Sequence, residues 1–190
     1  MSAPAIQTPK PQRADARRNR ERILEAARVV FAEQGAEAQM DDVARAAGVG
    51  VGTVYRHFPQ KDALMGELVA SKFRTFADNA EIALTVGDPW EAFAGLLRKN
   101  AETCARDIGI QQALGREPAA WAIALPELQR LTGLASELIR RGQAAGVLRA
   151  DLVVDDIPML MCGLSATQGV PGYDWRRHLE MLLDAMRARP

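Results

Sequence analysis

Apolar side chains recur at helical spacing along this chain, and strand-like alternation does not appear beyond residue 62. The first stripe consists of Ile23, Ala27, Val30 and Phe31, which fall at i, i+4, i+7 and i+8. Gly35 follows as a candidate left-handed C-cap. We therefore expect a helix that ends near Gly35 and an all-α fold for the chain as a whole.

Residues 41–58, DDVARAAGVGVGTVYRHF, predict two short helices joined by a glycine turn. Gly48 breaks the first helix, and Gly50 to Thr53 open the second. Val54 and Phe58 lie one turn apart and suit anchoring to a core. Paired short helices also occur as simple packing units. Here the second helix carries polar groups that can bond phosphates or base edges, which favours a helix-turn-helix.

Residues 20–68 resemble the N-terminal DNA-binding domain of the tetracycline-repressor (TetR) family of bacterial transcriptional regulators. The resemblance covers about a quarter of the chain and implies that one set of side chains contacts the DNA backbone while another lies nearest the bases. The implied backbone contacts are Thr53, Tyr55, His57 and Lys61, and the implied base-facing residues are Val51, Gly52 and Arg56. The positions that carry the resemblance are Ile23, Ala26, Phe31, Gly35, Val43, Ala44, Ala47, Gly48, Val49, Gly52, Thr53, Tyr55, Phe58, Lys61 and Leu64.

Three positions depart from the family pattern. Gln39 and Gln60 stand where capping hydroxyl or amide residues are common, and Gly50 occupies a turn position that usually holds Ser. Loss of a good N-cap costs roughly 1 kcal/mol, and Gly costs only a few tenths, so the fold should tolerate these changes. Val51 and Gly52 offer no side-chain hydrogen bond, so base recognition would depend on thymine methyls, Arg56 or DNA shape.

The formal net charge is zero, but basic residues are concentrated at the N-terminus. Residues 1–22 contain six basic side chains and two acidic ones. Residues 1–16 are expected to form a disordered basic arm, residues 17–62 the DNA-binding domain, and residues 63–190 an effector-binding and dimerisation domain. Arg13, Arg17 and Arg18 are expected to touch phosphates or the minor groove, although a basic tail can also be merely solubilising.

Two longer helices are predicted after the DNA-binding domain. Asp88, Pro89 and Glu91 form a helix start, which predicts a helix over about 89–105. Its predicted apolar stripe consists of Trp90, Phe93, Ala94, Leu97, Ala101 and Cys104. A second helix is expected over about 119–145, bent or divided at Pro126 and ended by Gly146.

Residues 156–168, DIPMLMCGLSATQ, are apolar nearly all round, which predicts a helix buried on two sides. TetR-like proteins dimerise through their last two helices, so the resemblance implies a homodimer on a palindromic operator. A helix buried within a monomer is the alternative. The predicted interface residues are Leu160, Leu164, Trp175, Leu179, Leu182, Leu183 and Met186.

The resemblance also implies an apolar cavity in the C-terminal domain for a small-molecule effector that changes the separation of the two DNA-binding domains. The simpler interpretation is that aromatic and Met side chains at helical spacing belong to an ordinary core. The candidate lining residues are Trp90, Phe93, Trp121, Met159 and Met161, with Arg106, Gln111 or Gln112 as polar contacts.

The two cysteines, Cys104 and Cys162, lie on apolar helical stripes, so we expect reduced, buried thiols and a cytoplasmic protein. Catalytic, metal and nucleotide motifs are lacking, and no apolar run reaches the roughly 18 residues of a membrane helix. We therefore expect no enzyme activity, cofactor or metal. The sequence favours a homodimeric repressor that an effector releases, with an activator or ligand-independent regulator as the alternative and a helical-bundle enzyme as a remote one.

Overall fold

The computed structural model describes residues 10–106 and 118–189, and they confirm the predicted all-α fold. Among these residues, the β-type pairing is limited to one isolated antiparallel bridge between Leu148 and Arg187. The helices, in chain order, are α1 (Lys10–Gln34), the 3-10 helix η1 (Gly35–Glu37), α2 (Met40–Ala47), α3 (Val51–His57), α4 (Lys61–Leu84), α5 (Pro89–Arg106), α7 (Pro118–Ala144), α8 (Asp156–Ser165) and α9 (Trp175–Met186).

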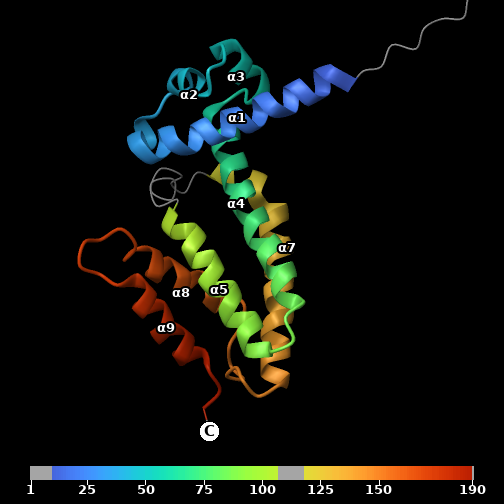
Figure 1. Ribbon diagram of the computed structural model, residues 1–190, viewed down its shortest axis with the longest axis vertical. Helices are drawn as coiled ribbons and strands as arrows, with labels where there is room; N and C mark the ends of the chain where they lie inside the picture. The colour runs from blue at the N-terminus through green and yellow to red at the C-terminus, as the bar shows by residue number, and fades with distance from the viewer. Residues whose placement is uncertain (1–9, 107–117, 190) are drawn as a thin grey trace, which may run out of the picture.

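The N-terminal helices and the first turns of α4 form one compact unit, which we call the head (residues 10–70). Figure 1 shows α1 crossing the upper end of α4, with α2 and α3 above it. The apolar stripe of α1 packs against α2, α3 and the segment of α4 from Leu64 to Ala70. The core of the head therefore continues past residue 62, where the sequence placed the domain boundary.

Helix α1 begins at Lys10, so residues 10–16 are helical and not the disordered arm that the sequence predicts. Ion pairs one turn apart line its exposed surface: Arg17 with Glu21 at 3.6 Å, and Arg18 with Asp15. Such pairs favour a helix without any apolar stripe. Apolar periodicity alone therefore could not locate the start of α1.

The remaining helices form the second unit, which we call the body (residues 71–189). Helix α5 lies between the α4–α7 pair on one side and α8–α9 on the other (Figure 1). The predicted helix start before α5 is confirmed, because the Asp88 carboxylate accepts a hydrogen bond from the backbone N–H of Glu91 at 2.9 Å. The predicted apolar stripe of α5 is also buried, from Trp90 to Cys104.

The sequence predicted that Pro126 would bend or divide this helix. Helix α7 is not divided at Pro126. Proline removes one backbone hydrogen bond from a helix interior. Helix α7 packs along the length of α4, and this long contact holds it together across that position. No helix in the described ranges is long and apolar enough to cross a membrane.

Candidate nucleic-acid interface

A tight turn between α2 and α3 fixes the angle of the helix-turn-helix. Gly48 ends α2 with φ of +62°, a left-handed conformation that favours glycine. From α1, the Arg22 guanidinium donates to the carbonyl oxygen of Ala47 at 2.6 Å, which caps the end of α2. At the other end of α2, the Asp42 carboxylate accepts from the backbone N–H of Gln39 at 3.3 Å, which is the contact that the third helical residue makes in a capping box.

Helix α3 divides into a buried face and an exposed face. Val54 and Phe58 are 0% and 3% exposed, so the predicted anchoring of this helix to the core is confirmed. Val51 and Tyr55 are 42% and 47% exposed, and Arg56 lies on the same outer surface.

The guanidinium of Arg56 lies along its own helix toward the helix N-terminus. Its Nε donates to the carbonyl oxygen of Gly52 at 3.1 Å, and its Nη2 donates to Thr53 Oγ1 at 3.3 Å. Gly50 and Gly52 leave open space around this end of the helix. The exposed N-terminal end of α3 therefore presents the Arg56 guanidinium and the Val51 side chain to a binding partner.

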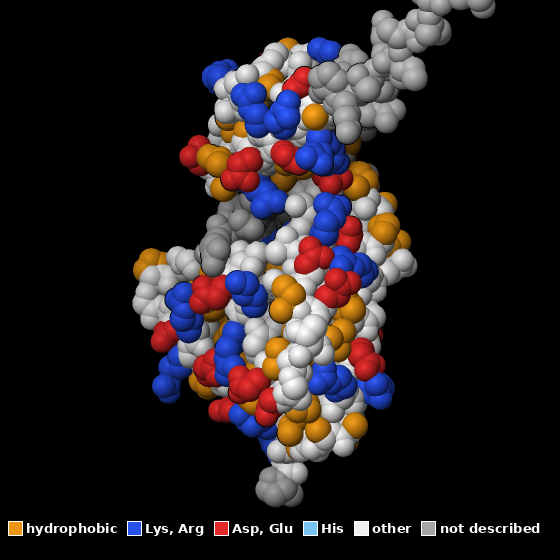
Figure 2. Space-filling model, turned by 45° about the vertical axis from the view of Figure 1, so that its right-hand side comes forward, with side chains coloured by type: hydrophobic (Ala, Val, Ile, Leu, Met, Phe, Trp, Pro, Cys, Tyr) orange, Lys and Arg blue, Asp and Glu red, His pale blue; other side chains and the backbone are white. Residues whose placement is uncertain are grey.

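Cations surround this helix on the surface of the head. Lys61 is the first residue of α4, and its Nζ lies 5.6 Å from the centre of the Phe31 ring. Arg17 and Arg18 project from α1 with exposed side chains. Figure 2 shows several Lys and Arg side chains over the head end. The head therefore combines a projecting helix with positive charge, the arrangement that suits the major groove and flanking phosphates.

Of the apolar residues predicted to line an effector cavity, Trp90, Phe93 and Met161 lie in or against the core of the body, and Trp121 and Met159 lie apart from it. Trp90 and Phe93 belong to the body core, where the Arg187 guanidinium lies 3.6 Å from the centre of the Trp90 ring. Trp121 is 41% exposed and contacts the Phe73 ring near the head. Met159 is 67% exposed on α8, whereas Met161 is half-buried. The Arg106 side chain and residues Gln111 and Gln112 lie outside the described residues.

Two cavities of about 380 Å³ each are lined by residues that the sequence did not single out as a pocket. One lies at the far end of the body, between the turn after α7 and the segment after α9. The other is a cleft between α1 and α4. Its lining residues are Arg17, Arg20, Glu21, Leu24, Glu25, Arg28, Ser71 and Arg74.

The predicted dimer interface needs a correction. Leu164, Leu179, Leu183 and Met186 are 0–3% exposed because they form part of the protomer's own core, which leaves them unavailable to a second chain. Leu160, Trp175 and Leu182 pack against the same core and are half-buried. Apolar stripes on two faces of one helix look alike in a sequence, and only the fold shows which one faces inward.

Different residues of the same two helices are exposed. We call them the outer face of α8–α9. On α8 they fall at i, i+3, i+4 and i+7, which is one helical stripe. They are Met159, Cys162 and Gly163 of α8, Ala166 directly after it, and Met181 and Ala185 of α9.

Of the two cysteines, Cys104 is buried as expected, but Cys162 is exposed on the outer face of α8–α9. The expectation of a buried Cys162 was wrong, because the rest of the chain covers only one side of α8. The arginines that tie α1 to other helices were also missed. Their partners lie 25 or more residues away, as for Arg22 and Ala47, so no local pattern announces them.

Comparison with known proteins agrees with this geometry. Residues 23–68 match the family of bacterial regulatory proteins of the tetR type, and residues 88–188 match the C-terminal domain of SbtR-like transcriptional regulators. An HTH-type transcriptional regulator of Staphylococcus aureus is 42% identical over 65 residues, which are 34% of this chain and 35% of that protein. The match thus spans about a third of the length of that relative.

Solved structures extend the likeness to nearly the whole chain. The TetR transcription regulatory protein from Mycobacterium vanbaalenii is 35% identical, with a TM-score of 0.68 over 94% of this chain and 100% of that one. The fold is also shared with the regulator FadR from Bacillus subtilis in complex with stearoyl-CoA, at 21% identity and a TM-score of 0.73, over 86% of this chain and 95% of that one. The chain belongs to the TetR family of bacterial transcriptional regulators.

Proposed function

We propose that this protein is a homodimeric transcriptional repressor that binds a palindromic DNA operator in the bacterial cytoplasm and is released by a small-molecule effector. The observation that carries the proposal is the helix-turn-helix on a basic head, with α3 anchored through Val54 and Phe58 and projecting Val51, Tyr55 and Arg56 outward. Family membership supports it, because both parts of the chain match regulators.

In this proposal the residues around α3 divide into two sets. Hydroxyl and cationic groups contact the DNA backbone and fix the register, while the groups at the helix N-terminus face the bases. The exposed methyls of Val51 suit the thymine methyl group, and Arg56 suits a purine edge once it leaves Thr53. The backbone set is Arg17, Arg18, Thr53, Tyr55, His57 and Lys61, and the base-facing set is Val51, Gly52 and Arg56. Gly50, which precedes α3, completes the DNA-binding surface through its main chain.

The homodimer would form through the outer face of α8–α9. Met159 and Met181 are 67% and 61% exposed and lie on two adjacent helices, so together they offer an apolar surface to a second chain. Gly163 and Ala166 beside them permit close approach of a second helix pair. An isologous dimer through this face would carry two heads, as a two-fold operator requires.

In this proposal the body receives the effector that releases the protein from DNA. The regulator FadR, which has a similar fold, forms a complex with stearoyl-CoA. For this chain the class of effector stays open. To move the DNA-bound fraction from 99:1 to 1:99, the effector must prefer the released conformation by about 5.5 kcal/mol. An activator, or a regulator that needs no ligand, is the alternative within the same family.

The proposal is tested by selection of bound duplexes from a random-sequence DNA pool with the full-length protein. We expect enrichment of one sequence with two-fold symmetry and loss of enrichment when α3 is disabled by Val51→Glu and Arg56→Glu together. These exposed residues are chosen because their substitution leaves the core of the head intact. A wild-type protein that enriches no sequence would refute the proposal.

A further inference from the structure

The cleft between α1 and α4 lies where the head meets the body, and we call it the arginine cleft. Its volume of about 380 Å³ falls in the range of sites that hold small organic molecules. Its walls carry an excess of positive charge, because four arginines line it against two glutamates. The arginines are Arg17, Arg20, Arg28 and Arg74, and the glutamates are Glu21 and Glu25.

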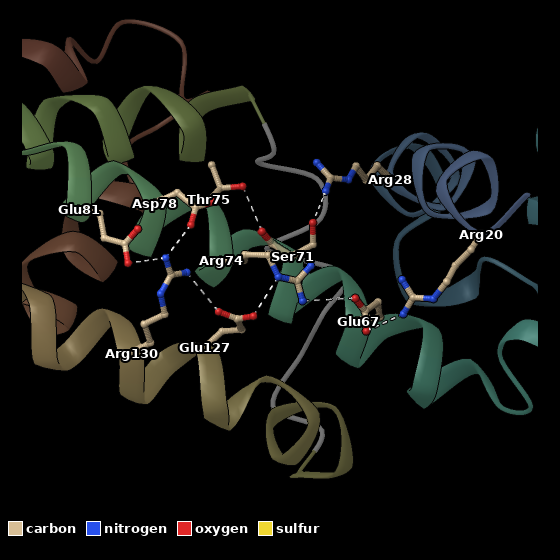
Figure 3. Close-up of polar contacts among 10 residues, drawn as sticks. All are labelled: Arg20, Arg28, Glu67, Ser71, Arg74, Thr75, Asp78, Glu81, Glu127 and Arg130. Atoms are coloured by element: carbon tan, nitrogen blue, oxygen red, sulfur yellow. Dashed lines mark hydrogen bonds and ion pairs between the residues drawn. The ribbon is translucent and has the colours of Figure 1, made fainter. Parts of the chain in front are cut away.

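Two of these arginines are held by carboxylates that do not line the cleft. The Arg20 guanidinium lies 2.8 Å from Glu67 Oε2, and Arg74 Nε lies 2.9 Å from Glu127 Oε1 (Figure 3). The carboxylate side chains of Glu67 and Glu127 are only 16% and 22% exposed, so solvent screens these contacts less than ordinary surface pairs. These two ion pairs join neighbouring helices and largely neutralise each other's charges in place.

Arg28 differs from the other arginines of the cleft in its partner. Its Nη2 donates to the neutral hydroxyl oxygen of Ser71 at 2.8 Å, as Figure 3 shows. Within residues 10–106 and 118–189, Arg28 forms no ion pair with a carboxylate. The residue is half-buried, and a partly buried charge costs free energy unless an opposite charge compensates it. An anion bound beside Arg28 would remove that cost.

Arg28 and Ser71 offer hydrogen-bond donors from two different helices. Ser71 takes up one N–H of the guanidinium, and the other N–H groups stay available to a ligand. Ser71 Oγ accepts the bond from Arg28, so its own hydroxyl proton can be donated to a third group. One edge of a guanidinium satisfies a planar carboxylate, whereas a tetrahedral phosphate presents oxygens to donors in several directions. This pair of side chains therefore favours a phosphate group.

The rest of the arginine cleft runs along α1 toward its N-terminus. Leu24 lies one turn from Arg28 and supplies an apolar wall, and Arg17 lies two turns beyond Leu24. Arg17 is 3.6 Å from Glu21, and these two side chains are 79% and 66% exposed. Solvent weakens a pair of this kind, so Arg17 adds positive charge at this end of the cleft. A cleft with a cationic end and an apolar wall suits a phosphate that carries an organic group.

We propose that the arginine cleft binds a small phosphate monoester. The phosphate group contacts Arg28 and Ser71, and the organic part lies along Leu24. The charges agree, because a phosphate monoester carries about −1.5 to −2 at pH 7 and the cleft has two more arginines than glutamates. The cleft lies apart from the core of the body, so this is a ligand site separate from the predicted effector cavity. It does not depend on DNA binding.

Titration calorimetry of the full-length protein with phenyl phosphate, in the absence of DNA, tests the site. We expect one molecule bound per chain. Arg28→Gln should lower the association constant by about tenfold or more, because hydrogen bonds to a charged group are lost. Arg45→Gln is the matched control, since it removes the same charge from an exposed position on α2 outside the cleft. It should change the association constant by less than about twofold.

Two further comparisons define the chemistry of the site. Ser71→Ala keeps every charge and removes one donor, so it should lower the association constant by about threefold. This variant also tests the site if Arg28→Gln does not fold, which thermal unfolding without ligand reveals. Benzoate has the same ring with a planar carboxylate, and it should bind at least about tenfold more weakly than phenyl phosphate.

Three results would overturn the inference. They are a wild-type protein that does not bind phenyl phosphate, an equal loss of binding in Arg28→Gln and Arg45→Gln, and benzoate binding as tight as that of phenyl phosphate. Because the titrations contain no DNA, these results would leave the proposed binding of an operator untouched.

Discussion

The head and the body differ in how completely one chain covers its own apolar surface. In the head, α1 to α4 enclose a core that includes Ile23, Val54 and Phe58, and the exposed apolar groups near α3 are few. In the body, α8 and α9 bury one side in the core and leave Met159 and Met181 exposed on the other. In the proposed dimer, the head is complete as a single chain, whereas the exposed side of α8 and α9 would be covered by a second chain.

The largest expected effect is on the free energy of unfolding, and it distinguishes a core residue from an interface residue on helix α9. Leu183 is fully buried, so Leu183→Ala should lower the free energy of unfolding by about 2–5 kcal/mol. Leu64→Ala, at an equally buried position in the head, should have a similar effect. Met181→Ala, two residues from Leu183, should change this free energy little when the chain is monomeric. Urea unfolding at several protein concentrations measures all three, and a small effect of Leu183→Ala would place that residue back at an interface.

A charge on the outer face of α8–α9 should separate the chains. Met159→Glu would place two like charges in a symmetric apolar contact, and we expect the association constant to fall by at least about 100-fold. Ile82→Glu is the matched control, because Ile82 is 65% exposed on α4, against 67% for Met159. Sedimentation velocity should show a folded monomer for the first variant and a dimer for the second. A dimer in both would mean that another surface holds the chains together.

Removal of a single cation from the head should weaken DNA binding in a salt-dependent way. Lys61→Ala should lower the slope of log K against log salt by about 0.9 per chain, because one phosphate contact is lost. Lys72→Ala is the control, since both ammonium groups lie over phenylalanine rings, Lys61 at 5.6 Å from Phe31 and Lys72 at 5.7 Å from Phe76. An unchanged slope for Lys61→Ala would exclude its phosphate contact.

The smallest expected effect is the pH-dependent contribution of one ion pair in the body to the free energy of unfolding. The Arg98 guanidinium donates to the Glu180 carboxylate and lowers the pKa of Glu180 below its ordinary value of 4.5. The pair therefore stabilises the fold above pH 4.5, and this contribution is lost as the pH falls through the lower folded pKa. Because both side chains are substantially exposed, Glu180→Gln should cost less than about 1 kcal/mol at pH 7 and nothing at pH 3. Thermal unfolding at the two pH values checks this, and an equal loss at both would contradict it.

The sequence predicted the head better than the body. The residues that shape the head act on their immediate neighbours in the sequence, whereas those of the body pack against distant segments. Gly48, Val54 and Phe58 act through their own turn or helix, so spacing alone located the helix-turn-helix. The stripe of α5 was also predicted correctly for this reason. In α9 the spacing identified an apolar stripe but not the helices against which that stripe packs. Leu183 was therefore assigned to a dimer interface, although it lies in the core of its own chain.

Contacts between distant residues could not be predicted from spacing. Arg20 and Glu67 are 47 positions apart, and each has an ordinary place on a polar helical face in the sequence. The start of α1 at Lys10 was missed because local ion pairs, and not apolar periodicity, favour helix there. Spacing also could not show how the candidate pocket residues are arranged: Trp90 lies in the core of the body, Trp121 contacts Phe73, and Met159 is exposed on α8. The effector cavity stays a prediction.

The central claim is that two heads joined through the bodies bind one two-fold DNA site. The most direct test is the number of chains bound to one selected duplex, measured by native mass spectrometry of the full-length protein. The account predicts two chains per duplex, and a single weakly bound chain when Met159→Glu prevents dimerisation. One chain per duplex for the wild-type protein, or tight binding by the monomeric variant, would contradict it.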